Sequence, residues 1–166
     1  MKKINYLVTF LTLLIIINGC SGYKPIFNSG NVNFQISESL IEGEEFLGKL
    51  ILSKLQNLSD QSKKKQNRKS INLYINVETN KNAAARDSAG KIKGYKITLS
   101  ANVKINDYLT NKEILNNTFS SSISYIKQKS YSDTVDVEKK VINDLINNAY
   151  QKLLIQLTQN INKNDY

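Results

Sequence analysis

The sequence predicts an α+β fold built as a two-layer sandwich, in which about four mostly antiparallel strands are covered by two helices. Apolar residues alternate with polar ones in four segments, which is the period of a half-buried strand. Two other segments repeat their apolar residues at helical spacing. Because the alternating segments are apolar on one face only, we expect the helices to cover that face. The predicted order along the chain is β-α-β-β-β-α.

The first strand is expected around Phe34, because Val32, Phe34 and Ile36 alternate with polar residues. A helix is expected directly after it, because Ser39 and Glu42 have the spacing of a capping box. The apolar positions that give this helix its buried stripe are Leu47, Leu50, Ile51, Leu55 and Leu58.

A polar and basic segment, residues 59–70, follows the first helix and is predicted to be an exposed loop. Three segments with alternating apolar residues come next, and we predict that each is a strand of the same sheet. They are Ile71–Val77, Tyr95–Ile105 and Leu115–Ile126. Residues 80–94 lie between the first two of these strands and are expected to form a loop.

The second helix is predicted to run from Asp133 to about Asn160. Asp133 can cap its first turn, and the carboxylates of Asp136 and Glu138 suit the positive end of the helix dipole. Its apolar stripe consists of Val137, Val141, Leu145, Ala149, Leu153 and Leu157, widened by Ile142, Ile146, Leu154 and Ile161. A metal site built from the three acidic residues is a weaker explanation than capping, so we expect no metal.

The N-terminus has the layout of a lipoprotein signal. Lys2 and Lys3 precede a mostly apolar run, Ile4–Ile17, and Gly19 stands directly before Cys20. The run is shorter than the roughly 20 residues that cross a bilayer as a helix. We therefore expect the leader to be removed and the thiol of Cys20 to carry a diacylglyceryl group.

A plain secretory signal and an uncleaved membrane anchor are the alternatives. The first would need a small residue at Ile17, and it would leave the one cysteine of the chain as a free thiol. The predicted segments are a signal peptide (1–19), a lipidated linker (20–30), one α+β domain (31–161) and a frayed tail (162–166). Ser21 is not the aspartate that typically retains lipoproteins in the inner membrane. The expected location is therefore the periplasmic side of the outer membrane, held by acyl chains.

The chain carries 23 Lys and Arg residues against 14 Asp and Glu residues, a net charge of +9. This balance suits an anionic partner, although an AT-rich coding sequence would also enrich lysine. The periplasmic location argues against nucleic acid. The chain has no histidine, and lipid would consume its one cysteine, so we expect neither an enzyme nor a cofactor.

Several short motifs resemble the family of lipopolysaccharide-assembly lipoproteins called LptE. The segment Cys20–Phe27 is similar to the family's Cys-Gly-Phe/Tyr-x-Pro-Leu-Tyr opening, except that Ser21 intrudes after the cysteine. Arg86, Gly90 and the strand Tyr95–Leu99 are similar to the family's arginine, glycine and Tyr-x-Leu strand. Ser121, Tyr125 and Tyr131 match positions before its long C-terminal helix. The basic segment Lys63–Lys69 has no counterpart.

The resemblance implies a non-enzymatic protein with two helices on a four-stranded sheet. It also implies that the protein sits inside the β-barrel LptD as a plug and assembly partner, where the two proteins move lipopolysaccharide to the outer leaflet. Cationic side chains suit the phosphates of such a glycolipid. The residues expected to contact glycolipid or barrel are Arg86, Lys91, Lys93, Lys127 and Lys129. The alternative is a free periplasm-facing lipoprotein that binds or carries an apolar or anionic ligand.

Overall fold

The computed structural model describes residues 33–61 and 68–163. The predicted signal peptide, Cys20, the linker and most of the Lys63–Lys69 segment lie outside these residues. The elements follow the order β1 (Phe34–Gly43), α2 (Glu45–Gln61), β2 (Lys69–Arg86), β3 (Ile92–Asp107), β4 (Glu113–Ile126) and α3 (Tyr131–Lys163). The predicted order and the two-layer fold class are confirmed.

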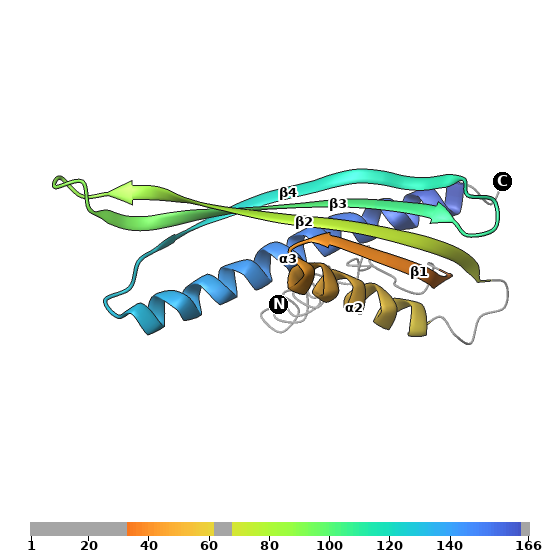
Figure 1. Cartoon of the computed structure of the whole chain (residues 1–166), viewed down its shortest axis with the longest axis horizontal. Helices are drawn as coiled ribbons and strands as arrows, with labels where there is room; N and C mark the ends of the chain where they lie inside the picture. Colours follow the sequence, from red (N-terminus) through yellow and green to blue (C-terminus); the bar gives the residue numbers. More distant parts are fainter. Residues whose placement is uncertain (1–32, 62–67, 164–166) are drawn as a thin grey trace, which may run out of the picture.

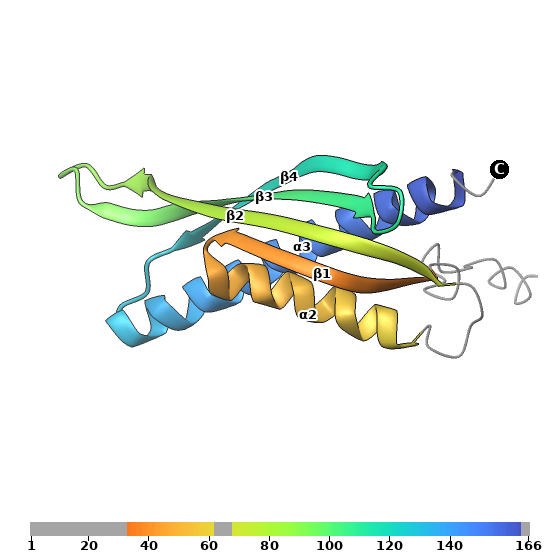
Figure 2. The ribbon, with the colours of Figure 1, turned by 45° about the vertical axis from the view of Figure 1, so that its right-hand side comes forward.

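The four strands form one sheet in the order β1-β2-β3-β4. β1 lies parallel to β2, which the helix α2 makes possible by carrying the chain back across the sheet, and the other two pairs are antiparallel. Both helices pack on the same face of the sheet (Figure 1; Figure 2). β1 and β4 are therefore the two edge strands.

The predicted start of the first helix is wrong. Ser39 and Glu42 belong to β1, where they pair with Leu73 and Asn76 of β2. The strand ends at Gly43, whose φ of 73° turns the chain into α2. Pairing with β2 overrides the local capping pattern because each further pair adds ladder hydrogen bonds.

The predicted loop 80–94 is also wrong for most of its length. β2 continues to Arg86 and pairs with β3 as far as Ile92, so the two strands form one long hairpin. Backbone hydrogen bonds hold the outer part of this hairpin together, although its side chains do not alternate between apolar and polar. Two register shifts between Ala83 and Arg86 bend it. Figure 1 shows the hairpin extending past the end of β4.

The second helix begins two residues earlier than predicted. The backbone N–H of Asp133 donates to Ser130 Oγ at 3.0 Å, so Ser130 is the residue that caps α3. Asp133 lies in the first turn, where its charge favours the helix dipole.

The core lies between the sheet and the two helices. The sheet contributes alternate residues of each strand, and the helices contribute the stripes that the sequence predicts. The most fully buried large side chains are Phe34, Ile51, Leu55, Ile71, Ile75, Ile97, Leu99, Ile105, Leu145, Ile146, Leu153 and Leu157. Within the described ranges, no helix is both long and apolar enough to cross a membrane.

The opposite face of the sheet is uncovered and polar. Neighbouring strands there set short polar side chains beside each other, as in the pairs Asn72 with Asn106 and Ser100 with Ser120. Asn102 Nδ2 donates to Thr118 Oγ1 at 2.9 Å across one such pair.

Candidate functional site

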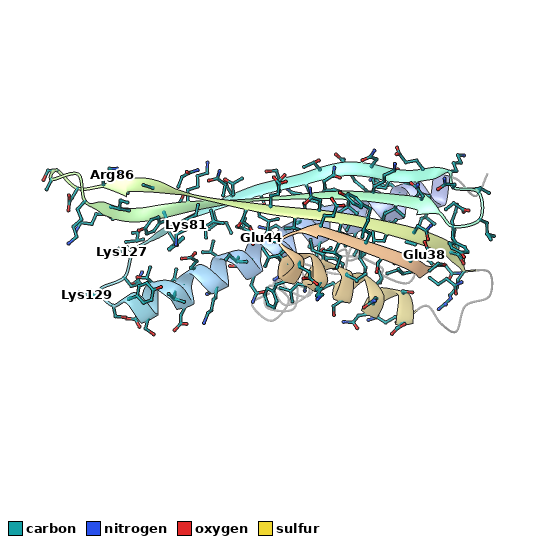
Figure 3. The ribbon with its side chains drawn as sticks, viewed as in Figure 1. Glu38, Glu44, Lys81, Arg86, Lys127 and Lys129 are labelled. Atoms are coloured by element: carbon teal, nitrogen blue, oxygen red, sulfur yellow. The ribbon has the colours of Figure 1, made fainter. Side chains whose placement is uncertain are left out.

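Five cations that the sequence selects lie at one end of the molecule, which we call the basic end: Arg86, Lys91, Lys93, Lys127 and Lys129. Three belong to the tip of the β2–β3 hairpin and two to the connection between β4 and α3. Figure 3 shows Arg86, Lys127 and Lys129 at the same end, far from Glu38 on β1. All five are exposed.

Arg86 is the last residue of β2 and holds the turn that follows. Its Nη1 donates to the carbonyl oxygen of Gly90 at 2.8 Å. Gly90 has a φ of 80°, a conformation that glycine adopts without steric cost. Asp87 Oδ1 accepts hydrogen bonds from the backbone N–H groups of Ala89 and Lys91 at 3.1 and 2.9 Å. The turn is therefore fixed by its own side chains, which keeps the tip cations close together.

The two parts of the basic end are joined through the backbone. Lys127 N–H donates to the carbonyl oxygen of Lys93 at 2.8 Å, which places the β4–α3 connection beside the hairpin. Lys93 Nζ lies 3.5 Å from Asp87 Oδ2 at an exposed position. Since exposed ion pairs are weak, Lys93 can exchange Asp87 for another anion at little cost. Lys129 lies two residues further along the connection.

A sixth cation, Lys81 of β2, was missed by the sequence prediction. Lys81 Nζ forms an ion pair with Glu138 of α3 and lies 4.6 Å from the centre of the Tyr95 ring. Tyr125 Oη donates to the same Glu138 carboxylate at 2.8 Å. The alternation of Ile71, Leu73, Ile75 and Val77, extended by four residues, would have placed Lys81 on the helix-facing side of the strand.

This cluster shifts the pKa values of its members. The hydrogen bond with Glu138 raises the pKa of Lys81 above its usual value, although partial desolvation opposes it. Burial alone would raise the pKa of Glu138, but hydrogen bonds from Lys81 and Tyr125 outweigh burial and lower it. Burial and the neighbouring carboxylate raise the pKa of Tyr125. At neutral pH, Lys81 and Glu138 are therefore both charged and Tyr125 is protonated.

A cleft of about 450 Å³ lies between this cluster and the first turns of α3. It is amphiphilic, because lysines, tyrosines and aliphatic side chains all face it. Its lining includes Lys81, Tyr95, Lys127, Tyr131, Val135 and Ile142. Tyr131 is 82% exposed, so apolar surface continues at the outer rim of the cleft. Ile126 is 72% exposed, but it follows the helix-facing Tyr125 in β4 and therefore lies on the uncovered face of the sheet.

The arrangement can bind an anion that carries an apolar part. Cations at the hairpin tip and in the cleft offer hydrogen-bond donors to phosphate or carboxylate oxygens. In residues 33–61 and 68–163, no group of three or more His, Cys, Asp or Glu side chains could hold a metal ion. Asp133, Asp136 and Glu138 have other partners: Asp133 lies in the first turn of α3, Asp136 lies 3.8 Å from Lys139, and Glu138 pairs with Lys81.

No family model matches this chain, and no curated protein does either. Solved structures with a similar fold include the rare lipoprotein B from Shewanella oneidensis, at 10% identity and a TM-score of 0.55. That match covers 76% of this chain and 98% of the other.

Two further structures share the fold at similar levels. A lipoprotein B from Nitrosomonas europaea matches with a TM-score of 0.58 and 14% identity over 82% of this chain and 90% of its own. A minor lipoprotein from Acinetobacter baumannii matches with a TM-score of 0.56 and 13% identity over 76% of this chain and 92% of its own. At such identities the likeness is one of fold: this chain has the fold of several bacterial lipoproteins.

Proposed function

We propose that this chain is an outer-membrane lipoprotein, anchored through acyl chains on Cys20, that acts as plug and assembly partner of an LptD-type β-barrel in lipopolysaccharide transport. The observation that carries the proposal is the two-layer fold, which this chain shares with bacterial lipoproteins such as rare lipoprotein B. The role is non-enzymatic.

Four of the residues behind the family resemblance support this proposal because they lie in one part of the structure. Arg86 hydrogen-bonds the carbonyl of Gly90, and Gly90 has the positive φ that the turn needs. Tyr95 and Tyr125 are cross-strand partners with ring centres 5.8 Å apart. Arg86, Gly90, Tyr95 and Tyr125 thus lie together near the basic end, whereas the Cys20–Phe27 opening lies outside the described residues.

The character of the surface supports a place inside a barrel. The interior of a transmembrane barrel is polar and hydrated. The uncovered sheet face carries short polar side chains that suit contact with such a wall. Lipopolysaccharide would meet the protein at the basic end, where its phosphates face the cations and its acyl chains face Tyr131 at the rim of the cleft.

A free carrier lipoprotein is the alternative function. A carrier needs a ligand cavity between the sheet and the helices. Buried side chains from both layers form the core, and the cleft of the basic end opens next to it, between the strands and the first turns of α3. The filled core favours the plug, whereas the cleft is the place where a carrier would hold its ligand.

Affinity purification in a mild detergent tests the proposal, with a tag at the C-terminus of the full chain. We expect a large β-barrel protein to copurify, and we expect mass spectrometry to find Cys20 acylated and the leader removed. Depletion of the protein should reduce lipopolysaccharide at the cell surface. An unmodified Cys20 would contradict the anchor. A chain that retains a lipid without any barrel would support the carrier.

A further inference from the structure

The two edge strands, β1 and β4, differ in how much of their outer side other parts of the chain contact. At the β4 edge, side chains of α3 bind backbone carbonyl oxygens: Lys152 Nζ donates to Ser120 at 3.1 Å, and Asn160 Nδ2 donates to Ile114 at 3.0 Å. At these two positions α3 occupies carbonyl groups of β4, which makes this edge less open to pairing with another chain.

The β1 edge has little such cover. Ser59 Oγ of α2 donates to the carbonyl oxygen of Phe34 at 3.1 Å, at the start of the strand. From Gln35 to Gly43, the backbone makes hydrogen bonds only with β2 among the residues that the structure describes. Along a strand, successive residues direct their N–H and C=O groups alternately to one side and to the other. The side of β1 that faces away from β2 therefore carries a row of unpaired backbone groups.

The same edge presents a short pattern of side chains. Glu38, Leu40 and Glu42 alternate along β1 and point to the uncovered face, where Tyr74 Oη donates to Glu42 Oε2 at 2.6 Å. Leu40 is 57% exposed. A hollow of about 500 Å³ beside it is lined by Glu38, Leu40, Tyr74 and Lys104, among others.

We propose that the outer edge of β1, from Glu38 to Gly43, binds an extended segment of a partner protein as a fifth strand. The register with β2 is regular over these residues, because the one shift lies between Ile36 and Glu38. An added strand would satisfy the outward backbone groups. Its side chains on the uncovered face would lie beside Glu38, Leu40 and Glu42, so the matching segment carries a basic, an apolar and a basic residue at alternate positions.

The charges disfavour a second copy of this chain as the occupant in the register centred on Leu40. Antiparallel self-pairing centred on Leu40 would set each Glu38 directly opposite a Glu42 of the other copy. Like charges at directly opposite positions destabilise a strand pair. The two glutamates therefore favour a basic strand over a second copy of this edge, which gives specificity as well as attachment. This inference does not depend on the lipid anchor or on the proposed barrel.

A synthetic strand tests the proposal directly. The probe is a fluorescein-labelled peptide Thr-Lys-Thr-Ile-Thr-Lys-Thr, titrated with the full chain in detergent and followed by fluorescence anisotropy. We expect saturable binding that weakens with salt, together with slower amide hydrogen exchange in residues 38–43. The double variant Glu38→Lys/Glu42→Lys should lose about tenfold in affinity or more, and it should gain affinity for the same peptide with glutamate in place of lysine.

Two controls separate strand addition from charge attraction. The variant Glu113→Lys/Asp136→Lys makes the same change of charge away from β1 and should bind the lysine peptide almost as well as the parent. A peptide whose alternate backbone nitrogens are methylated keeps its charge but cannot pair with the edge, so it should not bind.

Three results would overturn the proposal. Equal binding of the methylated peptide would show attraction without strand addition. Equal loss in the Glu113→Lys/Asp136→Lys variant would show that net charge alone governs binding. A dimer of the chain in analytical ultracentrifugation that Leu40→Lys dissociates would make a second copy the occupant.

Discussion

Arg86 combines a structural contact with an exposed charge. Its guanidinium binds the Gly90 carbonyl with one nitrogen, and its other N–H groups face solvent at the hairpin tip. A guanidinium has five donors in a planar fork, so it can hold the turn and an anion at the same time. Arg86 is one of two arginines in a chain whose other cations are lysines.

We expect Arg86→Ala to weaken binding of purified lipopolysaccharide by about fivefold, the effect of one exposed charge-assisted contact. The melting temperature should fall by no more than about 2 °C, because the lost hydrogen bond is exposed. Isothermal titration and a thermal melt measure the two effects. Lys104→Ala removes a cation from the other end of β3 and is the matched control. Unchanged affinity in Arg86→Ala would remove this residue from the site.

Glu138 makes the stability of the basic end depend on pH. Its pKa is lower in the folded chain than its usual value of 4.5, so the folded state favours the charged form. The stabilisation is therefore fully present above about pH 4.5 and is lost as the pH falls through the lower folded value. The raised pKa of Lys81 has no effect in this range, because Lys81 is charged throughout.

Glu138→Gln should lower the free energy of unfolding by about 1 kcal/mol at pH 7, because the ion pair with Lys81 is lost. The difference from the parent chain should shrink as the pH falls below 4.5 and should vanish once Glu138 of the parent is protonated. Urea denaturation at pH 3, 5 and 7 measures it. A constant difference at all three values would show that Glu138 acts by packing and not by its charge.

The bend between β1 and α2 depends on one glycine. Gly43 has a φ of 73°, and a Cβ at this position would collide with the carbonyl oxygen of Val77. The next residue uses that same oxygen, because Glu44 N–H donates to it at 2.7 Å. Gly90 has a similar φ of 80°, but a Cβ there would meet no atom within 4 Å. Both glycines have a positive φ, but only Gly43 would add a steric overlap on substitution. Comparing the two positions therefore separates the cost of backbone strain from the cost of overlap.

Gly90→Ala should cost about 1 kcal/mol of stability, the strain of a left-handed residue alone. Gly43→Ala should cost about 3 kcal/mol, because Val77 must also move and the bond from Glu44 is disturbed. Chemical denaturation of both variants gives the comparison. Equal losses would show that the chain relieves the overlap at Gly43 without disturbing β2.

Segments with one face in the core could be predicted from the sequence, because their apolar residues recur at a regular spacing. Segments held mainly by backbone hydrogen bonds to a neighbouring strand could not. β3, β4 and the stripe of α3 alternate or repeat clearly because each has one face in the core. The second half of β1 and the end of β2 lie at an edge or beyond the helices, so their side chains carry no such signal. Lys81 escaped prediction for a different reason: it faces α3, but its charge interrupts the apolar alternation that marks the helix-facing side of β2.

At the scale of the molecule, two groups of charged side chains lie at different places. The basic end and the acidic edge of β1 lie apart, as the positions of Arg86 and Glu38 in Figure 3 show. Between them the uncovered sheet face is polar and nearly free of large apolar side chains. Three surfaces of different chemistry therefore lie on one small domain. Such a molecule is suited to several simultaneous contacts rather than to one.

A plug differs from a partner docked on one side because it is surrounded. We expect a photo-crosslinking residue at Ser122, on the uncovered sheet face, to label the barrel in intact cells. The same residue at Asn148, on the outward face of α3, should label the same barrel protein, because a lumen encloses both faces. Both side chains are exposed, so neither substitution should lower the melting temperature. Labelling from Ser122 alone would indicate a partner on one side of the sheet, and labelling from neither would favour a free lipoprotein.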